Sequence, residues 1–160
     1  MAADRPRRPL ILVVDDEMHL RLFIKAVFES AGYAVGTASN GKEGLAWIRA
    51  HGPDLVSLDL MMPEQGGIRL LQELRDDPDL AQTKVMIVSA IDDATFDHAV
   101  TLVRTGAHGD LVTADGYVEK PPTADAILCE ARRILDQTDP RTGDTLKEEE
   151  ISHGQKNHGG

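Results

Sequence analysis

Short apolar runs alternate along this sequence with longer segments of helical periodicity, and this alternation limits the possible folds most strongly. Residues 10–14, 55–58 and 85–88 are almost uninterruptedly apolar, which is typical of strands that helices cover on both faces. Residues 34–37 predict a weaker strand and residues 117–119 a short final one. Because helical segments separate these runs, the sequence predicts an α/β fold with a parallel sheet and right-handed crossovers.

Five helices are indicated by apolar residues that recur at intervals of three and four positions. In chain order these residues are Leu20, Phe23, Ile24, Val27 and Phe28; Leu45 and Ile48; Leu70, Leu71 and Leu74; Phe96, Ala99, Val100 and Val103; and Ile127, Leu128, Ala131, Ile134 and Leu135. Asn40 and Thr123 stand where a helix would begin, and Gly32 and Gly52 where a helix would end. We expect each apolar stripe to face the sheet.

The strand and helix patterns span residues 9–138, and a chain of 160 residues fits one domain. Residues 1–8 are expected to form a charged N-terminal tail. Residues 139–160 are polar, charged and Gly-containing, which is typical of a disordered tail. The sequence therefore predicts one folded domain between two tails.

The composition argues against several classes of function. Seventeen basic residues against 27 acidic ones give a net charge of −10, whereas nucleic-acid binding needs clustered Lys and Arg. No run approaches the roughly 20 apolar residues of a membrane span, and the run after Arg8 is too short for a signal peptide. The single cysteine, Cys129, cannot form an internal disulfide and fits a reducing compartment. We therefore expect a cytoplasmic protein that binds neither nucleic acid nor membrane.

Reactive side chains follow four of the predicted strands at the point where each strand ends. Asp15 and Asp16 follow the first strand, and Asp59 follows the third. Ser89 ends the fourth strand, and the fifth leads into Lys120. Ligands of an open parallel sheet bind beyond the carboxyl ends of its strands. We therefore expect these side chains to meet at one edge.

The residue types at this edge suit phosphoryl chemistry. Asp15, Asp16 and Asp59 offer the oxygen ligands that Mg²⁺ takes together with water and phosphate oxygens. A carboxylate at the centre of the edge can attack phosphorus and form an acyl phosphate, and Asp59 has that position. The ammonium of Lys120 and the hydroxyl of Ser89 can bind other phosphoryl oxygens. The residues thus predict a phosphoacceptor that uses Mg²⁺.

Five motifs, taken in order, resemble the receiver domain of two-component response regulators, a CheY-like family. They lie at residues 13–17, 54–63, 66–67, 89–90 and 117–121. The resemblance implies a flavodoxin-like, doubly wound sheet of five parallel strands in the order 2-1-3-4-5, with helices on both faces.

The resemblance also implies a role for each residue of the acidic cluster. Asp59 would accept phosphate from a sensor histidine kinase or a phosphotransfer protein. Asp15, Asp16 and Asp59 would hold Mg²⁺, and the backbone carbonyl of Met61 would complete the protein's share of the ligands. The chain would catalyse only its own phosphorylation and slow dephosphorylation, and is not expected to be an enzyme in any other sense.

Three further residues receive a role through the resemblance. Lys120 would pair with the phosphate, and Ser89 would move to bind it, with Tyr117 as the aromatic partner of this switch. The Lys120–Pro121 bond resembles one that is cis in the family.

A downstream protein, or a second copy after phosphorylation, would bind the face formed by the fourth helix, fifth strand and fifth helix. The short polar segment after Leu135 suggests a stand-alone receiver.

Two departures from the family pattern are expected to matter. Lys120 follows Ser89 by 31 positions, about nine more than is usual in receivers, and most of the excess lies around residues 108–115. We expect this insertion to alter partner choice. At two positions where receivers can carry a side chain that orients the hydrolytic water, this sequence has the bulky, apolar Met61 and Ile91. Neither side chain can orient water, which predicts slow self-dephosphorylation.

Three alternatives compete with a phosphorylated receiver. A receiver-fold interaction module would keep the fold and work without phosphate. A hydrolase of the haloacid dehalogenase kind would need an Asp-x-Asp motif after the first strand, which residues 14–17 lack. A flavodoxin-like cofactor domain would need a Gly/Ser/Thr-rich phosphate loop at the same place.

Overall fold

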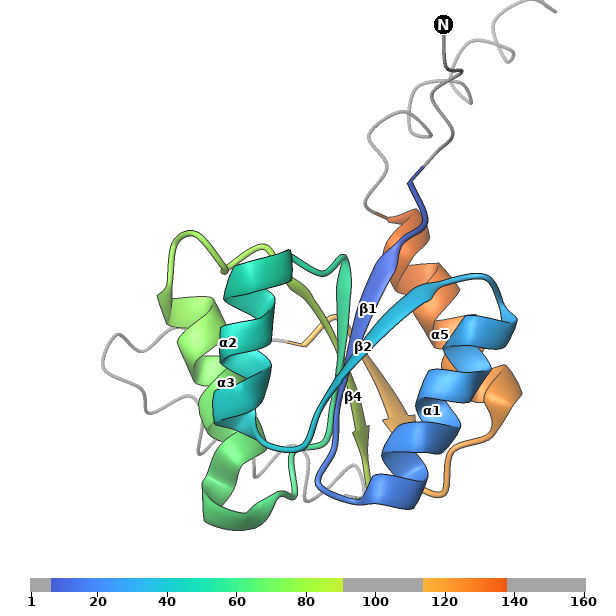
Figure 1. The fold of residues 1–160 in the computed structure, drawn as a ribbon, viewed down its shortest axis with the longest axis horizontal. Helices are drawn as coiled ribbons and strands as arrows, with labels where there is room; N and C mark the ends of the chain where they lie inside the picture. The colour runs from blue at the N-terminus through green and yellow to red at the C-terminus, as the bar shows by residue number, and fades with distance from the viewer. Residues whose placement is uncertain (1–6, 91–113, 138–160) are drawn as a thin grey trace, which may run out of the picture.

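A five-stranded parallel sheet in the order β2-β1-β3-β4-β5 forms the centre of the molecule (Figure 1), in a computed structural model that describes residues 7–90 and 114–137. The strands are β1 (Leu10–Val14), β2 (Ala34–Ala38), β3 (Leu55–Leu58), β4 (Lys84–Ser89) and β5 (Gly116–Glu119). The predicted fold class and strand order are therefore confirmed. Strands β2 and β5 lie at the two edges of this sheet.

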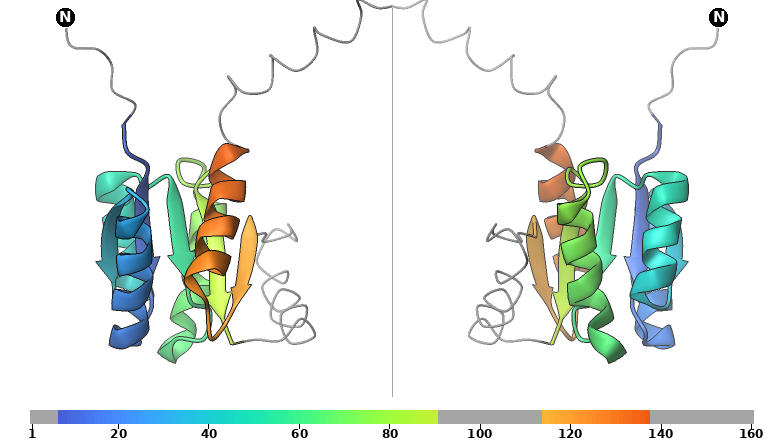
Figure 2. Two further views of the ribbon diagram at one scale, coloured as in Figure 1. Left: turned by 90° about the vertical axis from the view of Figure 1, so that its right-hand side faces the viewer. Right: turned by 90° about the vertical axis from the view of Figure 1, so that its left-hand side faces the viewer.

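Helices cover both faces of the sheet, as predicted. Helices α1 (Met18–Ser30) and α5 (Ala124–Asp136) lie on one face, and α2 (Gly41–His51) and α3 (Gly66–Asp76) on the other (Figures 1 and 2). A short 3₁₀ turn, η1 (Pro63–Gln65), precedes α3. The expected helix at residues 96–106 and most of the insertion around residues 108–115 lie outside the described residues. None of the helices that the structure describes is long and apolar enough to cross a membrane.

Alternation along the strands divides the apolar core into two layers. From β1, Ile11 and Val13 face α1 and α5, whereas Leu12 and Val14 face α2 and α3. The first layer adds Ile24, Val27, Phe28, Leu55, Met86, Val88, Val118, Ile127, Ala131 and Ile134. The second adds Ala38, Ile48, Val56, Leu58, Leu60, Met62, Leu70, Leu71, Leu74, Val85 and Ile87. Each large side chain buried in this way contributes about 1.5–3 kcal/mol to stability.

The helix boundaries follow the capping residues identified in the sequence. Asn40 Oδ1 accepts a hydrogen bond from the Glu43 N–H at 2.8 Å, and Thr123 Oγ1 accepts one from the Ala126 N–H at 3.1 Å. Gly52 ends α2 in the left-handed conformation, with φ 57°, which costs little without a Cβ. These local signals place α2 and α5 correctly.

The apolar stripe of α1 is narrower than predicted. Ile24, Val27 and Phe28 are buried, but Phe23 is 42% exposed. Residues at i, i+3 and i+4 already fill the side of α1 that faces the sheet, and Phe23 lies about 100° around the helix from Ile24. The prediction that Phe23 belongs to the buried face was therefore wrong.

The indole of Trp47 covers the edge strand β2. A Cβ at Gly36 would lie 2.1 Å from Trp47 Cζ2, so this close packing requires glycine in the strand. The indole also stacks on the imidazole of His51, with ring centroids 4.3 Å apart. Trp47 therefore belongs to the layer of α2 and α3.

Candidate functional site

The carboxylates of Asp15, Asp16 and Asp59 meet at the carboxyl edge of the sheet. One oxygen from each lies within 4.8 Å of the others. Asp15 is 1% exposed and Asp59 3% exposed, while Asp16 faces solvent. The structure thus brings together the three acidic residues that the sequence separates by up to 44 positions.

The loop between β1 and α1 holds Asp15 through its backbone and its side chain. The Asp15 N–H donates to the carbonyl of Ala38 at 3.2 Å, and Asp15 Oδ1 accepts from the Glu17 N–H at 2.9 Å. The guanidinium of Arg21 in α1 donates to the Asp15 carbonyl at 2.7 Å. These bonds fix the direction in which the Asp15 carboxylate points.

Asp59 is fixed as firmly from the other side of the site. Its N–H donates to the Val14 carbonyl at 3.0 Å, and its Oδ1 accepts from the Met61 N–H at 2.9 Å. A Cβ at Gly67 would lie 2.0 Å from the Asp59 carbonyl oxygen, so only glycine lets α3 pack this close to the Asp59 backbone. Sequence reasoning placed Gly67 in a motif but did not find this contact.

Lys120 lies between the two buried carboxylates. Its Nζ donates to Asp59 Oδ2 at 3.1 Å and lies 3.1 Å from Asp15 Oδ2. The second contact is a charge pair without hydrogen-bond alignment, because Asp15 Oδ2 has no hydrogen-bond partner among the described residues. The ammonium therefore offsets part of the negative charge of the cluster.

Burial and neighbouring charges shift the pKa values of Asp15 and Lys120 in opposite directions. Burial raises the pKa of Asp15, although the Glu17 N–H and the Lys120 ammonium lower it, and Asp59 raises it further. Burial alone would lower the pKa of Lys120, but the charges of Asp59 and Asp15 outweigh burial and raise it. The ammonium is thus held charged beside a carboxylate that is costly to ionise.

Ser89 and Tyr117 lie next to this cluster on β4 and β5. Ser89 is fully buried, and its Oγ has no hydrogen-bond partner within the described ranges. The Ser89 carbonyl accepts from the Lys120 N–H at 2.9 Å and from the Tyr117 hydroxyl at 3.2 Å. Both residues predicted to switch are therefore in contact with each other.

Met61 contributes its backbone to the site and its side chain to the surface. The side chain is 63% exposed, while the Met61 N–H holds Asp59. The Lys120–Pro121 peptide bond is cis, as expected from the sequence. Ile91, the other bulky residue predicted beside the site, lies outside the described residues.

The donor set fits Mg²⁺. The cluster supplies carboxylate oxygens only, as a hard divalent cation prefers. Asp15 Oδ2 is buried and has the Lys120 ammonium 3.1 Å away but no hydrogen bond from the described part of the chain, so a lone pair is left that a divalent cation would satisfy. Asp15, Asp16 and Asp59 are thus suited to hold Mg²⁺, with the Met61 backbone adjacent.

Sequence reasoning missed one contributor, Arg21. Its bond to the Asp15 carbonyl depends on how α1 leaves the β1 loop, and an arginine on the first turns of a helix gives no signal of such a contact. The other predicted residues, Asp15, Asp16, Asp59, Lys120 and Ser89, are brought together as expected.

Comparison with known proteins gives a family match over most of the chain. The model of the response regulator receiver domain matches residues 11–132. Among curated relatives, the probable transcriptional regulator ycf27 of Porphyra purpurea is 35% identical over 132 residues, which is 82% of this chain and 49% of the relative. The DNA-binding dual master transcriptional regulator RpaA of Synechocystis is 32% identical over 143 residues, or 89% of this chain and 55% of the relative. The chain thus spans about half the length of the curated relatives it matches.

Solved structures agree with this match. The receiver domain of the Francisella response regulator 1452 has a TM-score of 0.69 at 30% identity and covers 82% of this chain and 100% of its own. The chemotaxis protein CheY4 of Vibrio cholerae has a TM-score of 0.70 at 23% identity, covering 81% and 100%, and shows the fold alone. With the acidic cluster and Lys120 at the edge of a 2-1-3-4-5 sheet, these matches show that the chain belongs to the response regulator receiver domain family.

Proposed function

We propose that Asp59 accepts a phosphoryl group from a phosphohistidine donor in a reaction that depends on Mg²⁺. The observation that carries this proposal is the position of Lys120, whose ammonium lies 3.1 Å from both Asp59 Oδ2 and Asp15 Oδ2. A cation held between two buried carboxylates at a ligand-binding sheet edge is suited to bind an incoming phosphoryl group. The donor is a sensor histidine kinase or a phosphotransfer protein.

In this reaction a carboxylate oxygen of Asp59 attacks phosphorus, and the bond between phosphorus and the donor imidazole breaks. The electron pair of that bond leaves with the imidazole, and Asp59 becomes an acyl phosphate. The Met61 N–H and the Lys120 ammonium hold the two Asp59 oxygens, so the nucleophile is oriented before the donor arrives. Mg²⁺, when bound, would neutralise charge on the transferring group.

Phosphorylation is expected to shift the contacts of Lys120 and Ser89. The ammonium gains phosphoryl oxygens as partners, and the buried Ser89 hydroxyl, which has no hydrogen-bond partner among the described residues, gains an acceptor. Tyr117 is bonded to the Ser89 carbonyl, so movement of Ser89 reaches β5. We propose that this changes the face expected from β5, α5 and the helix predicted from the sequence at residues 96–106, where a downstream protein or a second copy would bind.

Incubation with acetyl phosphate and Mg²⁺, followed by intact-mass measurement, tests the proposal. We expect one added phosphoryl group, which is lost in Asp59→Asn and absent when a chelator replaces Mg²⁺. Wild-type protein that gains no mass from acetyl phosphate or from a phosphohistidine donor would contradict it. That result would favour the alternative of an interaction module that works without phosphate.

Several wider expectations stay predictions. Catalysis limited to self-phosphorylation, cytoplasmic localisation and the domain boundaries 9–138 are inferred from the sequence. Two relatives are named as transcriptional regulators, one of them DNA-binding, so the expected absence of nucleic acid among the partners has no support from the comparisons. An electrophoretic shift assay with duplex DNA, with and without phosphorylation, tests that expectation directly.

A further inference from the structure

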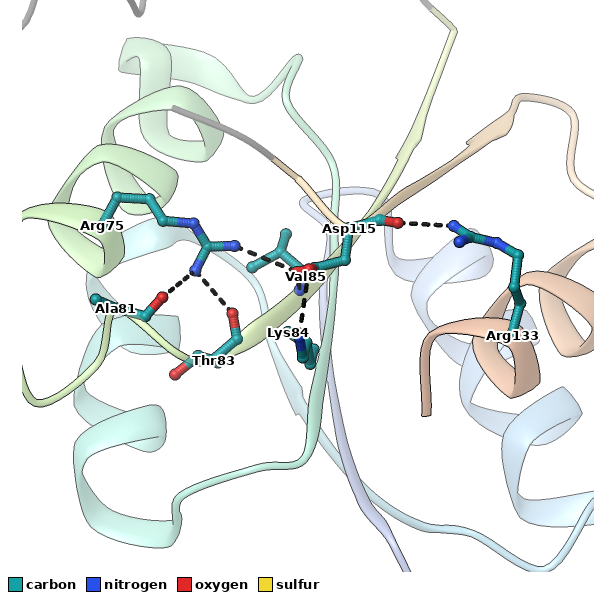
Figure 3. A network of polar contacts seen from close by, with 7 residues as sticks. All are labelled: Arg75, Ala81, Thr83, Lys84, Val85, Asp115 and Arg133. Carbon is teal, nitrogen blue, oxygen red and sulfur yellow. Dashed lines mark hydrogen bonds and ion pairs between the residues drawn. The ribbon is translucent and has the colours of Figure 1, made fainter. Parts of the chain in front are cut away.

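Asp115 contacts three elements, α3, β4 and α5 (Figure 3). It precedes β5 and so lies at the end of the sheet opposite the acidic cluster. Its Oδ2 accepts from the Val85 N–H of β4 at 2.8 Å and from the Arg75 guanidinium of α3 at 3.3 Å. The Lys84 ammonium lies 3.7 Å from its Oδ1. One carboxylate, placed just before β5, thus contacts the start of β4 and the end of α3.

The backbone of Asp115 is held as well. Its N–H donates to the Val85 carbonyl at 2.8 Å, so Asp115 and Val85 are bonded in both directions. Its carbonyl accepts from the Arg133 guanidinium of α5 at 2.7 Å. Glu130, paired with Arg133, accepts from the Tyr117 N–H at 3.3 Å. Residues at the start of β5 are therefore hydrogen-bonded both to β4 and to α5.

Arg75, the partner of Asp115 on α3, is itself held in place by burial and by hydrogen bonds. Its side chain is only 16% exposed, and it donates to the carbonyls of Ala81 and Thr83 at 3.1 and 2.8 Å. Burial lowers the pKa of Arg75, and the charge of Asp115 opposes that shift. The buried guanidinium therefore ties Asp115 to the segment that leads from α3 into β4.

β5 is short, so the side-chain bonds of Asp115 add to its backbone pairing with β4 and to the contacts from Arg133 and Glu130 of α5 in setting its register. It has four residues, lies at the edge and pairs within the described sheet with β4 alone, from Met86↔Gly116 to Ser89↔Glu119. A slip of one residue would turn every side chain of the strand to the opposite face. Lys120 follows Ser89 by 31 positions, so no short turn fixes the pairing. The register of β5 decides where Lys120 emerges.

We propose that Asp115 is a positioning residue for Lys120, because it fixes the register of β5 against β4 and so delivers the ammonium between Asp15 and Asp59. The inference rests on the proposed phosphoacceptor function of Asp59. Asp115 acts at a distance of five positions along an extended strand, which is roughly 16 Å. It touches none of the reacting groups.

The test compares Asp115→Ala with a matched variant, Asp54→Ala. Asp54 also anchors a strand at this end of the sheet, since its Oδ2 accepts from the Leu10 N–H of β1 at 2.7 Å, and its other side-chain bonds among the described residues go to Arg7 rather than to β5. Because β1 and β3 are internal strands, each paired on both sides, their register should survive the loss of this one bond. Asp115→Asn is the second variant, because its amide oxygen can still accept from the Val85 N–H. All variants are compared in buffer without denaturant, at a temperature at which circular dichroism shows that each is folded.

The first measurement is the rate of phosphorylation by acetyl phosphate. Asp115→Ala should lose on the order of ten-fold, as expected when a reacting group is misplaced, with Asp115→Asn recovering most of the loss and Asp54→Ala staying near wild type. In a Lys120→Ala background, Asp115→Ala should have no further effect, because it acts through Lys120. Mg²⁺ affinity should not weaken, because the acidic residues lie on other strands. Equal rates in Asp115→Ala and Asp54→Ala, or additive losses in the Lys120→Ala background, would overturn the proposal.

The second measurement separates this proposal from the phosphoacceptor function itself. Hydrogen exchange of the Lys120 amide, which donates to the Ser89 carbonyl at 2.9 Å, reports the register of β5 in unphosphorylated protein. We expect faster exchange in Asp115→Ala than in Asp54→Ala. Equal protection in the two variants would refute the anchor even if Asp59 is phosphorylated, and unequal protection would support it even if Asp59 accepts no phosphate.

Discussion

At the scale of single residues, burial of the Asp15 carboxylate in the acidic cluster lowers the stability of the folded protein. A carboxyl whose pKa is raised by burial above its ordinary value of 3.8 binds its proton more tightly in the folded state than in the unfolded state. Its contribution to stability is therefore present below pH 3.8 and is lost as the pH rises through the higher folded-state value. At neutral pH the ionised Asp15 carboxylate destabilises the fold.

We therefore expect Asp15→Asn to raise the free energy of unfolding at neutral pH in buffer without Mg²⁺. The gain should shrink as the pH falls, because the wild-type carboxyl then becomes protonated as well. Urea unfolding across this pH range measures the effect, with the exposed Asp16→Asn as the control. An Asp15→Asn protein less stable than wild type at neutral pH would show that the charge pair with Lys120 outweighs burial.

A second prediction concerns the lifetime of the phosphorylated form. The Met61 side chain is 63% exposed at the edge of the site and has no group that can orient a water molecule. We expect Met61→Asn to speed the loss of phosphate from Asp59 several-fold, on the scale of general acid–base assistance, whereas Met61→Leu should not. The decay of added mass after removal of acetyl phosphate measures both rates. Wild-type decay within seconds would contradict the predicted slow hydrolysis.

At the scale of the elements, the turn η1 carries local strain close to Asp59. Glu64 has φ 61°, a left-handed conformation that costs a side chain other than glycine on the order of 1 kcal/mol. Glu64→Gly is therefore expected to stabilise the protein by up to about 1 kcal/mol, as measured by thermal unfolding. Glu64→Ala, which keeps a Cβ, should give no such gain and serves as the control.

The elements themselves were largely predictable because their signals are local. Apolar runs indicated three strands, weaker patterns indicated the two edge strands, and Asn40 and Thr123 indicated two helix starts. Phe23 was misplaced because periodicity shows which residues share a side of a helix but not how wide a stripe the sheet covers. The strained turn at Glu64 left no trace in the sequence, since a glutamate gives no signal of positive φ.

The candidate site was predictable to a different degree. Asp15, Asp59 and Lys120 were found because strand ends in a parallel sheet share an edge and because the motifs resemble receivers. Arg21 was given no role, and Asp115 was assigned only to the insertion before the fifth strand, since each acts through a contact to a distant backbone group. Such contacts depend on how elements pack, which no spacing within the chain reveals.

At the scale of the whole molecule, the acidic cluster couples ion binding to folding. An unfolded chain does not bring Asp15, Asp16 and Asp59 together, so Mg²⁺ should bind the folded state alone. We expect Mg²⁺ at 100 times its dissociation constant to stabilise the protein by about 2.7 kcal/mol. Thermal unfolding with and without Mg²⁺ measures this, and Asp16→Asn should reduce the shift. An equal shift in that variant would contradict the proposed ligand set.

The packing of Trp47 over Gly36 has a practical consequence for such measurements. The chain has one tryptophan, and it lies in the layer of α2 and α3, while Tyr33 packs against Phe28 in the opposite layer. Indole fluorescence thus reports on the layer of α2 and α3 only. It will record the melting of one half of the sandwich, and only its coincidence with a signal from Tyr33 or Phe28 shows that both halves come apart together.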